Sequence, residues 1–186
     1  MSISARLEDA QVLYEQRRLE GALLVLLVAI AATSRKRYSR DTHSDKKAFT
    51  VFVQDEIATI TGTVSNVKIT GTFGLGYRGC PITFPDLLYG ILWNQLVHEA
   101  SMPGDIRFIH GGKVLVRVGN TIEFNEVFLQ GLANCVLLAP ESQPEHIPET
   151  VEPQEDPATL LARLYDGPLD FRRVLKWEAH PGAGIG

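Results

Sequence analysis

The stretch Ala22–Thr33 reads ALLVLLVAIAAT and is the most apolar run of the chain. It is shorter than the ~20 residues that a membrane-spanning helix needs. It also follows charged residues such as Arg6, Arg17 and Arg18, which places it too far along the chain for an ordinary signal peptide. A helix that is apolar on most of its faces is buried on most of them. The run therefore predicts the central helix of a helical bundle.

The flanking sequence extends this helix and adds others. Apolar residues at helical spacing predict an amphipathic helix over residues 4–16, followed by a joint near residues 17–21. The central helix is expected over 19–38, because Arg35, Lys36 and Arg37 place cations at its C-terminal end, where the helix dipole favours them. Ser44 is a candidate cap for a third helix that ends near residues 59–62.

The middle of the chain changes character. Residues 62–83 are rich in Gly, Thr and Ser, which predicts an irregular segment with extended pieces such as 63–70. Thr83 and Pro85 then mark the start of a helix that ends near Ala100. Residues 106–109 and 114–118 predict a hairpin turning at Gly111–Gly112, and 121–124 a third strand. A last helix is expected over 125–138. The fold class is therefore mainly α (α+β): a helical bundle with a small β insertion.

The composition changes again at Pro140. Prolines alternate with acidic residues over 140–157, which is typical of a linker. The predicted division is a helical domain over 1–139, this linker, and a tail over 158–186 with short helices at 158–165 and 170–179. The tail could act as a docking peptide for a protein partner. Its candidate anchors are Leu160, Leu161, Leu164, Tyr165, Phe171, Leu175 and Trp177.

Charge and cysteine content limit the classes of function. The 186-residue chain has a net charge of −4, which argues against a broad electrostatic surface for nucleic acid. Cys80 and Cys135 match neither a zinc spacing nor a disulfide framework and favour a reducing, cytoplasmic compartment. The five histidines show no metal-ligand spacing, and no nucleotide-binding glycine motif is complete. We expect no metal, no cofactor and no membrane contact.

Residues 93–99 read WNQLVHE on the helix expected to begin after Thr83. This segment resembles the signature helix of the HEPN family, in which an arginine, a polar residue and a histidine follow one another. Asn94 stands at the polar position and His98 at the histidine, while Trp93 replaces the arginine. The two opening helices and the segment after His98 are also similar to bacterial HEPN-like proteins, so the resemblance covers about residues 5–138.

The resemblance implies a mostly dimeric helical bundle, from a family that includes metal-independent endoribonucleases of toxin–antitoxin, abortive-infection and CRISPR systems. It implies His98 as the catalytic proton-transfer residue, with Asn94 orienting it or contacting the phosphate. Histidine suits proton transfer at neutral pH, and a cation must stabilise the phosphorane. Because tryptophan cannot supply that cation, other residues must replace it. The phosphate- or RNA-binding candidates are Arg35, Lys36, Arg37 and Arg78.

Two functions stay open at this point. One is a non-catalytic interaction or RNA-associated module in a bacterial defence or toxin–antitoxin setting, a homodimer with Trp93 at its interface. The other is a metal-independent endoribonuclease that uses His98 at the homodimer cleft. For His98 the structural alternative is a histidine that stabilises a helix C-terminus. For the basic cluster at 35–37 the structural alternative is a helix end that is simply exposed to solvent. The missing arginine and the acidic charge favour the interaction module.

Overall fold

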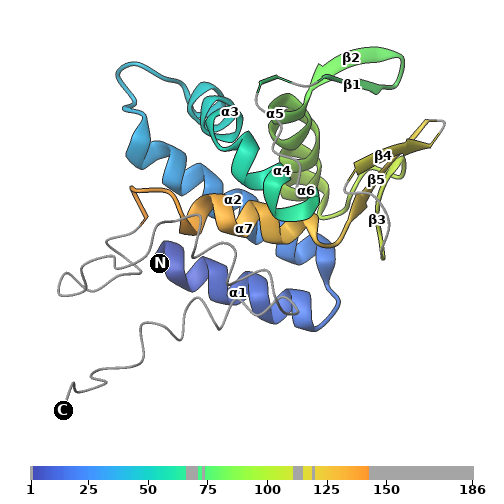
Figure 1. Ribbon diagram of the computed structural model, residues 1–186, viewed down its shortest axis with the longest axis horizontal. Coiled ribbons are helices and arrows are strands. Elements are labelled where there is room, and N and C mark those ends of the chain that lie inside the picture. Colours follow the sequence, from blue (N-terminus) through green and yellow to red (C-terminus); the bar gives the residue numbers. More distant parts are fainter. Residues whose placement is uncertain (1, 66–70, 73, 111–114, 119, 143–186) are drawn as a thin grey trace.

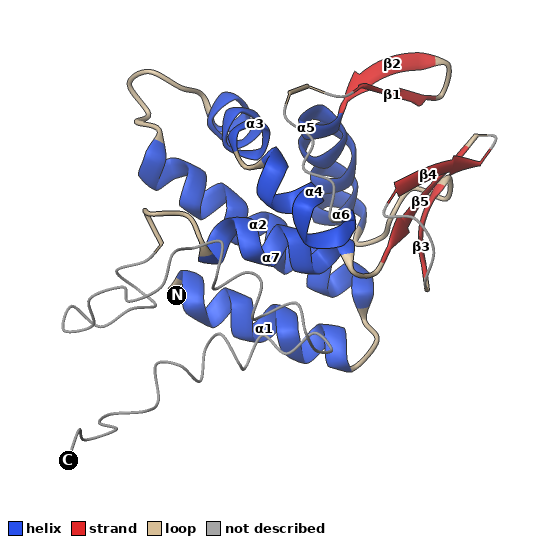
Figure 2. Ribbon diagram, viewed as in Figure 1, coloured by secondary structure: helices blue, strands red, loops and turns tan. Residues whose placement is uncertain are grey.

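The computed structural model describes residues 2–65, 71–72, 74–110, 115–118 and 120–142 (Figure 1). The fold is mainly helical, with small sheets at one side, as the sequence predicts (Figure 2). In chain order, the elements are α1 (Ile3–Glu15), α2 (Leu19–Arg37), α3 (Asp45–Asp55), α4 (Ile57–Ser65), β1 (Gly74–Tyr77), β2 (Cys80–Thr83), α5 (Phe84–Asp86), the π-helical segment η1 (Leu87–Trp93), α6 (Asn94–Glu99), β3 (Ile106–Ile109), β4 (Leu115–Val118), β5 (Thr121–Asn125) and α7 (Phe128–Leu137).

The apolar run lies in the middle of the bundle, as predicted. It forms most of α2, which packs against α1, α3 and α7. Leu23, Leu27 and Ile30 of α2 are all 0% exposed. Among the described residues, none of the helices combines the length and the apolar composition that crossing a bilayer requires. The run is therefore the core helix around which the rest of the bundle assembles.

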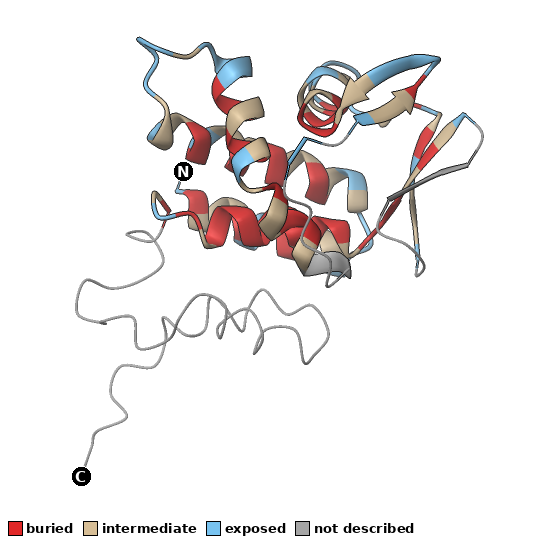
Figure 3. Cartoon of the chain, turned by 45° about the horizontal axis from the view of Figure 1, so that its top comes forward, coloured by how far each residue is buried: buried red, intermediate tan, exposed pale blue. Residues whose placement is uncertain are grey.

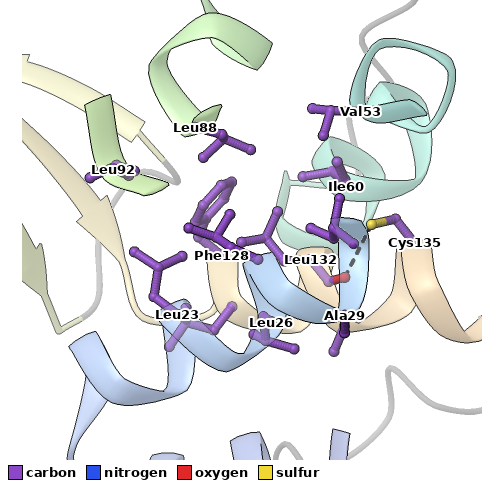
Figure 4. Close-up of a cluster of buried hydrophobic side chains, with 14 of the residues drawn as sticks. Leu23, Leu26, Ala29, Val53, Ile60, Leu88, Leu92, Phe128, Leu132 and Cys135 are labelled. Carbon is purple, nitrogen blue, oxygen red and sulfur yellow. Dashed lines mark hydrogen bonds between the residues drawn. The ribbon is translucent and has the colours of Figure 1, made fainter. Parts of the chain in front are cut away.

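The core brings together residues from most of the helices. Figure 4 shows Leu26 of α2, Ile60 of α4, Leu88 of η1 and Leu132 of α7 converging on one apolar cluster. Cys135 belongs to this cluster: burial raises the pKa of its thiol, which donates a hydrogen bond to a backbone carbonyl. Figure 3 shows the buried residues concentrated where the helices meet and exposed residues on the loop before α3 and on the β1–β2 hairpin.

Helix α7 crosses α4 at a distance that only glycine permits. A Cβ added at Gly131 would lie 2.4 Å from the carbonyl oxygen of Ile60, which is backbone and has little freedom to move. Real Cβ atoms essentially never come within 3.0 Å of another heavy atom in this way. The absence of a side chain at Gly131 therefore sets the spacing of these two helices.

Within the described part of the chain, side-chain caps begin α1, α3 and α5. The hydroxyl of Ser44 accepts a hydrogen bond from the backbone N–H of Lys47, and that of Thr83 accepts one from Asp86. Both caps are as predicted; Ser2 caps α1 in the same way. The prediction of one helix from Ser44 to residues 59–62 is wrong. It breaks at Glu56 into α3 and α4, and α4 continues to Ser65.

The prediction of an irregular segment over 62–83 is also wrong in part. Residues 74–77 and 80–83 form an antiparallel hairpin, with Tyr77 opposite Cys80. Arg78 and Gly79 both have positive φ, 48° and 81°, as the two-residue turns that best match strand twist require. Of the expected extended piece at 63–70, residues 63–65 are helical and 66–70 lie outside the described residues.

The second sheet corrects the predicted hairpin between 106–109 and 114–118. Its strand order is β3–β5–β4: β5 lies between the other two, parallel to β3 and antiparallel to β4. The prediction that the last helix begins at 125 is also wrong. Asn125 is the last residue of β5, and α7 begins at Phe128. Ile122 and Phe124 are buried, so β5 packs its inner face against the bundle.

Candidate functional site: the 89–98 face

The predicted helix after Thr83 is continuous from Phe84 to Glu99, but its middle is the π-helical segment η1. A π-helix closes i→i+5 hydrogen bonds and so turns less per residue than an α-helix. Residues four apart therefore stay nearly in line. Two adjacent rows result, which we call the 89–98 face; its members are Tyr89, Trp93 and Val97 in one row and Gly90, Asn94 and His98 in the other.

Aromatic rings anchor one side of this face. Tyr89 and Trp93 stack with their centroids 6.2 Å apart and their planes within 2°. The buried ring of Phe49, on α3, lies 5.2 Å from Tyr89 and 6.2 Å from Trp93. Trp93, the predicted dimer-interface residue, is thus partly covered by its own chain and partly exposed. Val97, in the same row, is 46% exposed.

The two predicted catalytic residues lie in the second row. Asn94 is exposed, and its side-chain amide donates a 3.1 Å hydrogen bond to the carbonyl of Gly90. His98 is exposed in the last turn of α6, before Ala100 ends the helix in a left-handed conformation. Within the part of the chain that the structure describes, no hydrogen bond or ion pair holds the His98 imidazole. The structure therefore places Asn94 and His98 one turn apart on one exposed face.

The predicted phosphate-binding arginines are already paired with carboxylates. Arg78 donates to Asp105 through both Nε and Nη2, at 2.7 and 3.2 Å, and this bond lowers the pKa of that carboxyl. Nε of Arg35 lies 2.7 Å from a carboxylate oxygen of Asp45, although without the alignment of a hydrogen bond. Its Nη1 donates to the carbonyl of His43. These two arginines hold loops of their own chain in place.

Arg37 is the most tightly held of the candidates. Its guanidinium donates to Glu141 from Nε and Nη2, at 2.8 and 3.0 Å, and to Glu56 at 2.8 Å. It also lies over the ring of Phe52, 4.6 Å from the centroid. Burial alone would lower the pKa of Arg37, but the hydrogen bonds from both glutamates raise it above its ordinary value. We call Arg37, Glu56 and Glu141 the Arg37 cluster. Its contacts are those of a structural residue.

The structure does not bring the cations at 35–37 to His98. The carboxylate of Glu20, in the first turn of α2, accepts a bond from the backbone of Met102, just beyond α6. Arg37 ends the same helix. At 1.5 Å of rise per residue, it lies roughly 25 Å further along. Lys36, also at that end of α2, is exposed. In one copy of the chain, the 89–98 face therefore lacks the basic cluster at 35–37.

A different set of chemically active side chains converges where the α1–α2 turn meets the ends of β3 and β5. One carboxylate oxygen of Glu126 accepts a 2.6 Å hydrogen bond from Arg17, and the other is bonded to Nδ1 of His110. These residues are 109 and 16 positions apart in sequence, so no local motif could have revealed them. We call them the Glu126 cluster. Within the described residues, no three side chains of metal-ligand type converge on a possible metal position.

A comparison with protein families gives a match over most of the chain. A protein-family model described as Rv1289 matches residues 2–180, which include the bundle, the predicted linker and most of the tail. No curated protein and no solved structure matches the chain. Two predicted segments lie outside the described residues: the linker beyond Ser142 and the docking peptide at 158–186.

Proposed function

The chain belongs to the Rv1289 family, and from its own geometry we propose that it is a non-catalytic interaction module that forms a homodimer through the 89–98 face. The observation that carries the proposal is the composition of that face. It exposes Val97 and part of the Tyr89–Trp93 stack, and its six residues include no lysine, arginine, aspartate or glutamate. The second row continues back to Asp86, whose carboxylate is paired with Lys46.

The occupant that suits such a face is a second copy of the same chain. In a two-fold symmetric dimer the same patch meets itself, so any charge on it meets a like charge near the axis. An uncharged row of aromatic and aliphatic side chains avoids that repulsion, and aromatic residues are enriched at the centres of interfaces. At Gly90 an added Cβ would meet no atom within 4 Å, which leaves room for a partner's side chain beside Tyr89. The HEPN resemblance supports the same choice, because that family is mostly dimeric.

Val97→Lys is expected to weaken the homodimer at least tenfold, because it places two like charges near the two-fold axis. A lysine in the last turn of α6 is compatible with the helix dipole, so the monomer should still fold. Val12→Lys is the matched control. Val12 is 47% exposed, against 46% for Val97, and it also lies in the last turn of a helix. Sedimentation over a range of concentrations measures the effect. A monomeric wild type, or equal weakening by Val12→Lys, would overturn the proposal.

The wild-type chain and the His98→Ala variant are expected to cleave single-stranded RNA at the same background rate. The reason is that metal-free cleavage needs a cation beside the imidazole, and Arg35, Arg37 and Arg78 are occupied by carboxylates of their own chain. A gel assay of both proteins, purified in parallel, makes the comparison. A loss of tenfold or more in the His98→Ala variant would instead favour the endoribonuclease alternative. The predicted defence or toxin–antitoxin setting stays a prediction.

A further inference from the structure

We propose that the Glu126 cluster binds the phosphate group of a small phosphate monoester, with Arg17 and His110 as the groups that contact it. The site is independent of the 89–98 face. It joins three segments that are distant in sequence: the turn between α1 and α2, the end of β3, and the turn between β5 and α7.

The carboxylate at the centre of the site is buried, while its two partners reach into solvent. The side chain of Glu126 is 8% exposed, whereas those of Arg17 and His110 are 61% and 79% exposed. Each carboxylate oxygen binds one partner, so the guanidinium and the imidazole are held beside each other. A buried carboxylate that orients exposed donors in this way preorganises them for a ligand, because their rotamer freedom is already restricted.

The backbone at Arg17 fixes the point from which its side chain starts. Arg17 has φ of 61°, at the residue that follows the C-terminus of α1. The N–H of Arg18 bonds back to the carbonyl of Leu13, which completes a helix ending where glycine is the favoured residue at position 17. Arg17 therefore adopts the left-handed conformation that Ala100 adopts at the end of α6. The role visible in the structure is to present the guanidinium to Glu126.

The hydrogen-bonding capacity of the site matches a phosphate. Arg17 uses one Nη1 donor on Glu126, and among the described residues its Nε and Nη2 make no hydrogen bond. Those groups form an edge of the guanidinium that can donate two parallel bonds to phosphate oxygens. Because Nδ1 of His110 donates to a carboxylate, Nε2 of that ring is the atom left to face the ligand.

A monoester suits this ring better than a diester or a sulfate. The second ionisation of a phosphate monoester lies near pH 6, so the ligand can carry a proton or release it near neutrality. A dianionic monoester accepts a hydrogen bond from Nε2–H of a charged imidazole, and a monoanionic one donates to Nε2 of a neutral ring. A diester has no proton to donate. When the imidazole is charged, the two cations Arg17 and His110 and the one carboxylate of Glu126 leave a net charge of one positive unit. A bound anion neutralises that charge.

The other ionisable groups around the site do not compete for this role. Tyr14, on α1, has its pKa raised by burial and then by the charge of Glu126, so its hydroxyl stays protonated. Arg107 and Glu123 pair with each other on neighbouring strands. Each of the two therefore already has its own partner of opposite charge. Glu126 is thus the carboxylate that orients the two donors.

The test measures binding of adenosine 5′-monophosphate, inorganic phosphate, adenosine 3′,5′-cyclic monophosphate and sulfate to the full chain by calorimetry. The informative variant is Arg17→Gly, because glycine relieves the strained backbone at position 17 and should preserve the fold while removing the guanidinium. Arg18→Ala is the matched control, since it removes the same charge from the next residue, which is also exposed. Thermal unfolding without ligand shows whether each variant keeps its fold.

We expect the monophosphate to bind at least tenfold more tightly than the cyclic diester and sulfate. If inorganic phosphate binds as tightly as the monophosphate, the site recognises the phosphate group alone. If it binds more weakly, the rest of the nucleotide contributes to binding. Both outcomes support the site. Arg17→Gly and His110→Ala should each weaken the monophosphate at least tenfold, and Arg18→Ala less than twofold. No measurable binding to the wild type at millimolar ligand, equal binding of the diester, or equal loss in Arg18→Ala would overturn the proposal.

Discussion

Gly131→Ala is expected to lower the free energy of unfolding by about 3 kcal/mol, the upper end of what overpacking usually costs. The added Cβ would lie 2.4 Å from the carbonyl oxygen of Ile60, so α4 and α7 must move apart. That movement opens the apolar cluster of Figure 4, to which both helices contribute. Urea denaturation followed by circular dichroism measures the change.

The matched control is Gly21→Ala, the same substitution in α2, away from the 89–98 face. At Gly21 the added Cβ comes within 4 Å only of the Leu13 side chain, at 3.5 Å or more, which is ordinary van der Waals contact. Alanine also has a higher helix propensity than glycine, so the variant should be neutral or more stable by up to about 1 kcal/mol. Similar destabilisation by both substitutions would mean that the loss comes from backbone flexibility and not from the close crossing of α4 and α7.

Arg37→Gln is expected to lower the free energy of unfolding by about 2 kcal/mol, the scale of hydrogen bonds to charged groups. The substitution leaves the carboxylates of Glu56 and Glu141 without their shared cation, although both side chains are largely buried, 16% and 21% exposed. Arg40→Gln is the control, because it removes the same charge from an exposed position in the loop before α3. If Arg40→Gln lost as much stability as Arg37→Gln, the change in net charge, and not the loss of the Arg37 cluster, would explain the effect.

The same cluster predicts a pH dependence. The hydrogen bond from Arg37 lowers the pKa of Glu141 below its ordinary value. A carboxyl whose pKa is lower in the folded than in the unfolded chain stabilises the fold above its unfolded pKa and loses that contribution as it is protonated. The difference in stability between the wild type and Arg37→Gln should therefore be constant near neutral pH and shrink below about pH 4. Chemical denaturation at several pH values tests this, and a difference that persists at pH 2 would contradict it.

The sequence predicted the helices where local chemistry is decisive. The caps at Ser44 and Thr83 and the limits of α2 are as expected, because a capping hydroxyl or an apolar run acts within a few residues. The break at Glu56 was not predicted. Glu56 binds Arg37 at the end of another helix, and that contact exists only in the folded bundle.

The strand order shows the same limit. The sequence indicates strands at 106–109, 114–118 and 121–124, and glycines between the first two favour a hairpin. In the fold, β5 separates them and pairs in parallel with β3. Ile122 and Phe124 of β5, both at most 1% exposed, belong to the apolar core, and their contact with it exists only in the fold.

By itself, the sequence determined the helical class, the buried position of α2 and the shared helix of Trp93, Asn94 and His98, since helix periodicity and apolar content are properties of adjacent residues. Only the tertiary structure decided what each charged side chain faces. It paired Arg35, Arg37 and Arg78 with carboxylates of their own chain, and it joined Arg17 and His110 through Glu126. Charged side chains pair with residues that are distant in sequence, so these pairs cannot be predicted from residue spacing along the chain.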